Sequence, residues 1–200
     1  MPRKKLPMTS ERPYHVWARS NNREWFYLPI SDFWDIVCAK LRVCQQRFKI
    51  QVHAYVLMDN HFHMLASTHE DHNLGEVMNF LQRETAKEVN RQTGRINHVF
   101  GGGYRASLVE TAEYYFQVFK YVYRNPVEAG LSETVESYPY STFEADAISC
   151  TSPLSGVAAL LPEPSRISFW LNTPEAVETT ERVKKGLRRT IYKPSGISRR

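Results

Sequence analysis

Residues 50–67, IQVHAYVLMDNHFHMLAS, contain two runs of β-branched, aromatic and other apolar side chains. The first run is Ile50–Leu57 and the second is His61–Ser67, and Asp59 and Asn60 lie between them. Asp and Asn favour tight turns because their side chains bond to nearby backbone groups. The stretch therefore predicts a β-hairpin.

The segments on both sides of this hairpin alternate between strand-like and helix-like patterns. Residues 14–19 alternate as a strand does, and residues 31–48 repeat apolar side chains at helical spacing. Three patterns follow the hairpin: a helix over 73–93, a short strand over 106–110, and a helix from Thr111 that Pro126 should end. This order predicts an α+β fold, in which helices pack on an antiparallel sheet with the hairpin at its centre, as in a ferredoxin-like sandwich.

The composition bounds the classes of protein to which the chain can belong. Its 200 residues allow one domain, and 42% hydrophobic with 24% charged residues exclude wholesale disorder. No apolar run is long enough to span a membrane, and the basic start MPRKKL lacks the apolar segment of a signal peptide. Cys38, Cys44 and Cys150 match neither a metal-binding spacing nor a disulfide framework. We therefore expect a cytoplasmic protein with reduced cysteines.

The net charge of +5 is unevenly distributed along the chain. Residues 1–12 carry +3 and residues 181–200 carry +7, so the rest of the chain carries −5. We expect a basic N-terminal arm over 1–12, a folded domain over 13–145, and a Ser- and Pro-rich connector with a basic tail over 146–200. Basic tails neutralise phosphates with a salt-dependent and sequence-independent affinity, although a charge run can also serve solubility alone.

Two histidines lie two residues apart at the start of the second run of the hairpin. Because side chains alternate between the two faces of a strand, His61 and His63 should share one face, opposite Phe62 and Met64. Two adjacent imidazoles are a natural beginning of a divalent metal site. A His-x-His pattern also arises by chance in strands, and the sequence has no HExxH motif of a zinc protease.

The last predicted helix presents a polar stripe. Gln117, Tyr121 and Asn125 are spaced four residues apart, so they lie along one side of the helix. The neighbouring positions are mostly aromatic or aliphatic and suit a core. The stripe indicates a polar purpose, but with 11 tyrosines in the chain Tyr121 could equally be an amphipathic side chain at the edge of the core.

These features combine in an order that resembles a known family. The matching segments are YHVWAR (14–19), AYVLMDNHFHML (54–65) and YVYRNPVEAGL (121–131). Together they resemble the one-tyrosine HUH transposases, named for a His, a hydrophobic residue and a second His. The resemblance is strongest to the REP-associated tyrosine transposases and covers roughly residues 13–145. It rests on the last two segments occurring together in this order and at this separation.

The resemblance implies an activity and the roles of four residues. Tyr121 matches the nucleophile, His61 and His63 match the HUH pair, and Asn125 matches a third metal ligand. The implied activity is cleavage of single-stranded DNA with Mg²⁺ or Mn²⁺, through a 5′-phosphotyrosine link, and strand transfer by the released 3′-OH. The implied partner is single-stranded DNA with a hairpin, which would associate the protein with the nucleoid. Relatives occur as monomers and as homodimers.

Further residues are candidate DNA contacts. Tyr104 and Arg105 follow a triple glycine, where they could stack on a base and clamp a phosphate, or equally be ordinary loop residues. Glu128 and the Phe100-Gly-Gly-Gly segment depart from the pattern of the family and leave the recognised DNA open. The full set of candidate contacts is Arg3, Lys4, Lys5, Arg19, Tyr104 and Arg105.

Two other classes of function remain compatible with the sequence. One is a domesticated module that binds DNA or RNA hairpins without cutting them, and the other is a metal-free α+β interaction domain. The enzyme is favoured because all four candidate catalytic positions are intact, whereas a decayed enzyme would be expected to lose some.

Overall fold

The computed structural model describes residues 5–143, 148–150 and 164–193. None of the helices in these ranges is long and apolar enough to cross a membrane. A 3₁₀ turn at Asn21–Arg23 follows the first strand. The elements, in chain order, are β1 (Tyr14–Arg19), α1 (Ile30–Phe48), β2 (Gln51–Met58), β3 (His61–Ser67), α2 (Leu74–Thr93), β4 (Arg105–Leu108), α3 (Ala112–Glu128), α4 (Pro164–Asn172) and α5 (Val177–Gly186).

The four strands form one antiparallel sheet in the order β2-β3-β1-β4. Strands β2 and β3 are the predicted hairpin, and β3 also pairs with β1, with Trp17 opposite His63. Strand β3 thus has a strand on each side, and isolated bridges from Ser141 and Cys150 contact the outer edge of β2. The βαββαβ order and this strand order confirm the expected ferredoxin-like α+β fold.

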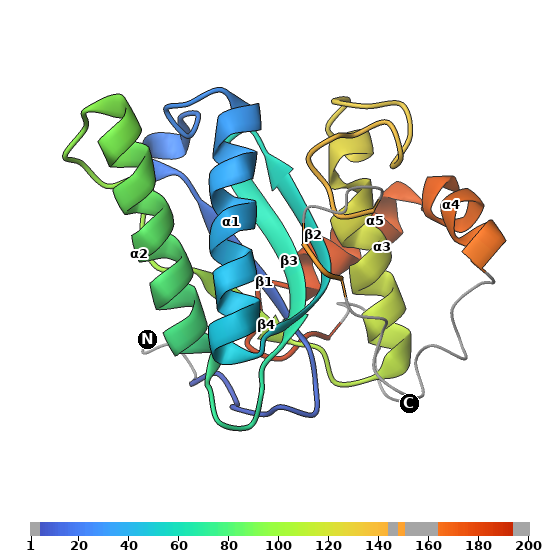
Figure 1. Cartoon of the computed structure of the whole chain (residues 1–200). Helices are drawn as coiled ribbons and strands as arrows, with labels where there is room; N and C mark the ends of the chain where they lie inside the picture. Colours follow the sequence, from blue (N-terminus) through green and yellow to red (C-terminus); the bar gives the residue numbers. More distant parts are fainter. Residues whose placement is uncertain (1–4, 144–147, 151–163, 194–200) are drawn as a thin grey trace.

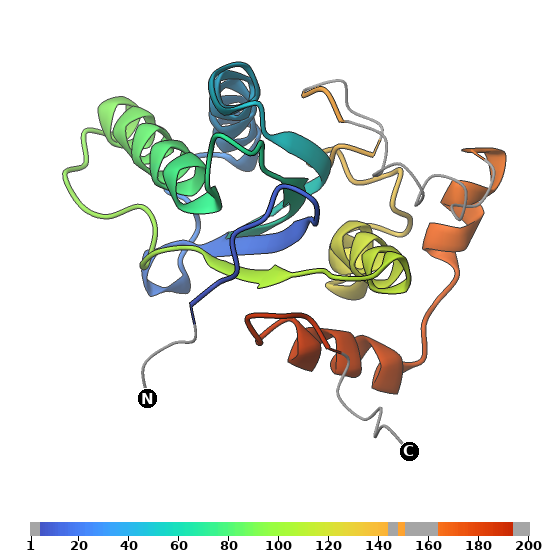
Figure 2. The same ribbon diagram turned by 90° about the horizontal axis from the view of Figure 1, so that it is seen from below.

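Helices cover both faces of the sheet (Figure 1). Helices α1 and α2 lie on one face, and α3 and α5 lie on the other, as the view from below shows (Figure 2). The first face packs Val16, Tyr55 and Phe62 against α1 and α2. The second face packs Val56 and Leu65 against α3, α5 and the chain after α5. The sheet is therefore buried on both sides, and each face has its own core.

Local sequence signals explain where the helices begin and end. Asn73 forms a capping box with Glu76 at the start of α2, and Gly94 ends that helix with the positive φ of 67° that glycine adopts readily. Helix α3 differs from the prediction, because it continues through Pro126 to Glu128. The Asn125 side-chain nitrogen donates to the carbonyl oxygen of Tyr121 at 2.7 Å and, at the longer distance of 3.4 Å, to the carbonyl oxygen of Val122. This side chain supplies a donor next to the position where proline has none, which lets the helix continue.

Residues 164–193, most of the described part of the predicted connector and basic tail over 146–200, are folded onto the domain. Helices α4 and α5 pack against α3, and Tyr192 is fully buried in the second core. Two buried cations of α3 hold α4 and the segment after it. Lys120 pairs with Glu175 at 2.7 Å, and Arg124 donates to the carbonyls at the end of α4. The basic residues within 164–193 therefore belong to the folded body.

The N-terminal segment also lies against the body over the residues that the structure describes. Leu6 packs against the first core, and the Tyr14 hydroxyl donates to the carbonyl of Pro7 at 2.9 Å. The basic arm predicted over 1–12 is thus docked from residue 5 onward, while Arg3 and Lys4 lie outside the described residues. The predicted connector lies mostly outside them too, between residues 150 and 164.

Candidate active site

The sheet brings three histidines together on its second face. His61 and His63 lie on the same side of β3, with ring centroids 5.1 Å apart, while Phe62 and Met64 point into the first core. Strand β1 adds His15, whose ring stacks on His63 with centroids 5.1 Å apart. The period-two prediction for His61 and His63 is confirmed in its geometry.

Helix α3 brings the candidate nucleophile over these histidines. It packs against β2 and β3, and the Tyr121 ring lies with its centroid 5.4 Å from that of His63. A cavity of about 350 Å³ is lined by His61, His63, Tyr121 and Asn125 together. The structure therefore gathers at one place the four residues that the sequence singled out from two distant segments.

Hydrogen bonds orient both histidines of the pair. The Nδ1 atom of His61 lies 2.8 Å from the Asn60 side-chain oxygen, and Nδ1 of His63 lies 3.0 Å from Nε2 of His15. In each ring the Nδ1 atom is thus engaged by the protein, which leaves Nε2 as the atom available to a ligand. Fixing a ring through one nitrogen so that the other can coordinate is the usual arrangement of a metal-binding histidine.

Burial keeps these imidazoles neutral. It lowers the pKa of His61 to about 4, and the charge of Arg19 acts in the same direction. Burial also holds the pKa of His63 well below its usual range, and it lowers the pKa of His15 to about 3. A neutral imidazole is the form that binds a metal, because protonation would occupy the coordinating lone pair.

The Tyr121 phenol is partly buried, and this sets its acidity. Burial raises the pKa of Tyr121 to about 12, while a hydrogen bond with the Asn125 side chain and the charge of Arg188 oppose that rise. A phenol is a weak nucleophile until it loses its proton, so this group needs further activation to attack a phosphate at neutral pH.

The residues present fit a divalent cation with a mixed set of ligands. Among the described residues there is no cluster of three or more His, Cys, Asp or Glu side chains able to hold a metal. A site here would thus combine His61 and His63 with the Asn125 side chain. The amide nitrogen of Asn125 is engaged by the backbone of α3, so its oxygen is the atom that would face a cation. Nitrogen and oxygen ligands of this kind suit Mn²⁺ better than Mg²⁺.

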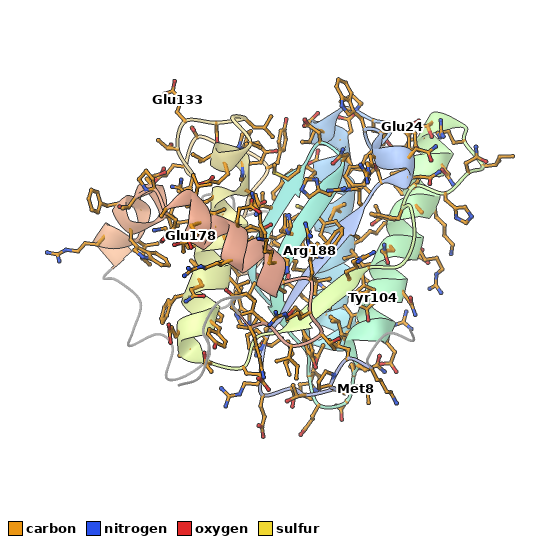
Figure 3. The ribbon with its side chains drawn as sticks, turned by 180° about the vertical axis from the view of Figure 1, so that it is seen from behind. Met8, Glu24, Tyr104, Glu133, Glu178 and Arg188 are labelled. Atoms are coloured by element: carbon orange, nitrogen blue, oxygen red, sulfur yellow. The ribbon has the colours of Figure 1, made fainter. Side chains whose placement is uncertain are left out.

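The predicted DNA contacts divide between two places. Arg19 lines the cavity of Tyr121, and Arg105 lies beside it, since both guanidinium groups contact the ring of Trp17 at 5.8 Å and 5.4 Å from its centroid. Lys5 and Tyr104 line a separate cavity of about 620 Å³. Arg188 lines the cavity of Tyr121 and not this second cavity (both Tyr104 and Arg188 are labelled in Figure 3).

Other features of the sequence receive structural roles. Tyr123, the neighbouring tyrosine, is buried in the second core, and its hydroxyl lies 3.1 Å from that of Thr142. Phe100 packs in the first core, and Glu128 pairs with Arg124 at 2.7 Å. The burial of Tyr123 leaves Tyr121 as the tyrosine of this segment that faces the cavity.

The sequence did not indicate several residues that line the same cavity. His15 and Trp17 lie in a segment identified as a strand, but their place beside β3 depends on strand pairing that no local pattern reveals. Lys184, Leu187 and Arg188 come from α5 and the turn after it, in a region interpreted as a charged tail. The apolar positions Val183 and Leu187, four residues apart, were the signal that could have marked α5 as packed.

The sequence assigns this fold and cavity to a known protein family. The family model of IS200-like transposases matches residues 9–125, more than half of the chain, and the chain belongs to this family. The match includes His61, His63, Tyr121 and Asn125, and it ends before α4 and α5.

One solved structure shows the same fold. The chain is similar to a REP-associated tyrosine transposase bound to a REP hairpin, with a TM-score of 0.58 and 17% identity over 72% of this chain and 83% of that one. A proposed transposase from Deinococcus radiodurans R1 matches with a TM-score of 0.41 and 13% identity, over 69% of this chain and 96% of that one. No curated protein matches the sequence.

Proposed function

We propose that this transposase is a single-stranded DNA endonuclease and strand transferase that acts in DNA transposition or in the processing of REP hairpins. The observation that carries the proposal is the shared cavity of Tyr121, His61, His63 and Asn125. A tyrosine beside two oriented imidazoles that could hold an activating cation is suited to a phenol-based attack on a phosphodiester.

In this proposal Tyr121 attacks the scissile phosphate. Its phenolic oxygen bonds to phosphorus, the bond from phosphorus to the 3′ oxygen breaks, and a 3′-OH is released while the 5′ phosphate stays on the tyrosine. Attack by a 3′-OH on that link would rejoin the strands. A divalent cation, Mg²⁺ or Mn²⁺, held by His61, His63 and Asn125, would supply positive charge that polarises the phosphate.

The substrate proposed is single-stranded DNA next to a hairpin. Membership of the transposase family supports DNA as the substrate, and the similar structure bound to a REP hairpin supports a folded partner of that kind. Arg19 and Arg105, which flank Trp17 beside the cavity, are the residues expected to meet the strand as it enters.

The test is to trap the covalent link. The full chain is incubated with Mn²⁺ and labelled single-stranded oligonucleotides that carry hairpins from the DNA flanking its own gene. We expect a protein–DNA adduct that resists denaturation, and mass spectrometry should locate the modification on Tyr121. An omission of Mn²⁺ and addition of a chelator should prevent the adduct.

Two results would change the proposal. Tight hairpin binding with no adduct under any divalent metal would favour the non-cleaving binding module. An adduct on a different tyrosine would retain the activity but move the nucleophile away from the cavity of His61 and His63.

A further inference from the structure

Helix α5 lies over the second face of the sheet and packs against α3, the helix that contains Tyr121 (Figure 3). Val183 and Leu187 are buried in the second core, and Leu187 lines the cavity that contains Tyr121. This helix lies beyond residues 9–125, the part of the chain that the family model matches. The roles carried by the family pattern therefore do not extend to it.

The segment after α5 fixes the position of the helix. The Tyr192 hydroxyl donates to the Gln117 side chain at 2.8 Å, one turn before Tyr121 on α3. The Leu108 N–H donates to the carbonyl of Thr190 at 2.9 Å, and the Tyr192 N–H donates to the carbonyl of Leu108 at 2.8 Å. Residues 190–192 therefore pair with β4 as a short parallel edge strand would. Gly186 lies so close to Tyr192 that a Cβ would come within 2.7 Å of the ring. These contacts hold α5 in place over the site.

Two cations from this segment line the cavity. Lys184 and Arg188 are four residues apart and share one side of the segment, and both line the 350 Å³ cavity of Tyr121. Lys184 also lines a smaller cavity of about 150 Å³ that contains His61 and Asn125. Lys185 and Arg189, their neighbours in sequence, line neither cavity.

The charge of this cavity is of one sign. Arg19 from β1 is the third cation on its wall, and no carboxylate is among the described residues that line it. Lys184 pairs with Glu181 at 3.1 Å, a half-exposed carboxylate that does not line the cavity but whose charge helps to raise the pKa of Tyr121. A hollow lined by two guanidinium groups and an ammonium, without a carboxylate, is suited to an anion with several acceptor oxygens.

We propose that Lys184 and Arg188, together with Arg19, form a phosphate site that holds the DNA backbone beside Tyr121, so that α5 is part of the substrate-binding surface. This inference rests on the proposed function for its ligand, a phosphodiester of single-stranded DNA. Lys184 and Arg188 bind the phosphates that flank the scissile bond, and α5 fixes the direction of the strand across Tyr121.

The chain supplies its own matched controls. Lys184→Gln and Arg188→Gln remove one charge each from the cavity, and Lys185→Gln and Arg189→Gln remove one charge each from adjacent exposed positions. All four proteins are checked for unchanged melting temperature. Their binding to a fluorescent single-stranded oligonucleotide with a hairpin is then measured by anisotropy at several salt concentrations.

We expect each cavity variant to bind about tenfold more weakly, the effect of one charge-assisted contact, and each control to change less than twofold. The log–log salt slope should fall by about 0.7 for each cavity charge removed. Arg188→Lys should recover part of the affinity, because it retains the charge but loses the fork of donors. Equal losses in both pairs, or binding unchanged in all four variants, would overturn the phosphate site.

The adduct assay separates this inference from the proposed function. If the unsubstituted protein forms no adduct but the cavity pair still binds more weakly than the control pair, the phosphate site stands and the cleavage does not. If the adduct forms and the two pairs behave alike, the cleavage stands and the phosphate site fails. More adduct in Lys184→Gln or Arg188→Gln than in the unsubstituted protein would overturn the inference by making α5 a cover over the site.

Discussion

The two faces of the sheet are buried to a similar degree but differ in chemistry. Toward α1 and α2 the strands present apolar and aromatic side chains, such as Val16, Phe62 and Met64. Toward α3 and α5 they present His15 and His63 among the apolar positions, each at most 6% exposed. One strand, β3, contributes to both faces through alternate residues.

Because of this difference, residues that stabilise the fold and residues that form the candidate site are neighbours in the sequence of β3. Polar groups are costly to bury unless they find partners, so their concentration on one face indicates a function that offsets the cost. The buried strand residues of the first core are apolar or aromatic, and their only side-chain hydroxyls are those of Tyr14 and Tyr55. Substitutions at adjacent positions of β3 should therefore have opposite consequences.

The largest effect is expected at Tyr121. Tyr121→Phe removes the attacking oxygen and should reduce adduct formation below detection, with hairpin binding within twofold of the unsubstituted protein. No apolar volume is lost, so the free energy of unfolding should change by less than about 1 kcal/mol. Tyr123→Phe, on the same helix but inside the core, is the control and should still form the adduct. An adduct in Tyr121→Phe would refute its role.

The next effect compares neighbours on opposite faces. His61→Ala should lower adduct formation by about 100-fold or more, because a Lewis acid supplies several kcal/mol to the reaction, while stability changes little. Phe62→Ala should cost roughly 3–5 kcal/mol of unfolding free energy through the cavity that it leaves. Denaturant titration and the adduct assay measure both. A stability loss at His61 as large as that at Phe62 would contradict the division between the faces.

A smaller effect is expected at His15, which acts through His63. Replacement of His15 by Leu leaves Nδ1 of His63 without its partner at 3.0 Å and should weaken Mn²⁺ binding by 10- to 100-fold. His15→Gln retains an acceptor and should recover part of the affinity. Calorimetric titration with Mn²⁺ measures the change directly. Equal Mn²⁺ affinity in His15→Leu and the unsubstituted protein would show that His15 only fills space.

Local patterns in the sequence predicted most of the fold, because most helices and strands show the apolar spacing and the end residues typical of their type. The bounds expected for β1 and β3 match the structure, and α2 is within one residue. Helix α3 was expected to stop at Pro126, because the substitute donor on Asn125 depends on a side-chain geometry that a sequence pattern does not contain. Helix α5 was missed because its few buried positions are surrounded by charges.

The sequence predicted the parts of the candidate site that lie within one strand or one helix. His61 and His63 share a face through the period of a strand, and Tyr121 and Asn125 share a side through the period of a helix. Only the resemblance to a family indicated that the two pairs meet. The residues that come from other elements, His15 and Arg188, depend on strand pairing and on the docking of α5, which are properties of the tertiary structure.

The smallest effect concerns residues 194–200, which contribute a net charge of +2. Deleting residues 181–200 would not test charge alone, because it also removes Val183, Leu187 and Tyr192 from the second core. Ending the chain at Lys193 removes residues 194–200, whose only charged side chains are Arg199 and Arg200. The log–log salt slope of binding should then fall by at most about 1.4, since each contact with a single-strand phosphate contributes about 0.7.

This shorter deletion should leave the choice of hairpin unchanged. Selectivity requires contacts with bases, which the folded body would make, whereas phosphate contacts carry no sequence information. Competition between a cognate hairpin and a scrambled one, measured in both proteins, checks this directly. If the deletion abolished discrimination while the salt slope stayed constant, residues 194–200 would be the ones that contact bases. The folded body, including the second face of the sheet, would then not account for the choice of hairpin.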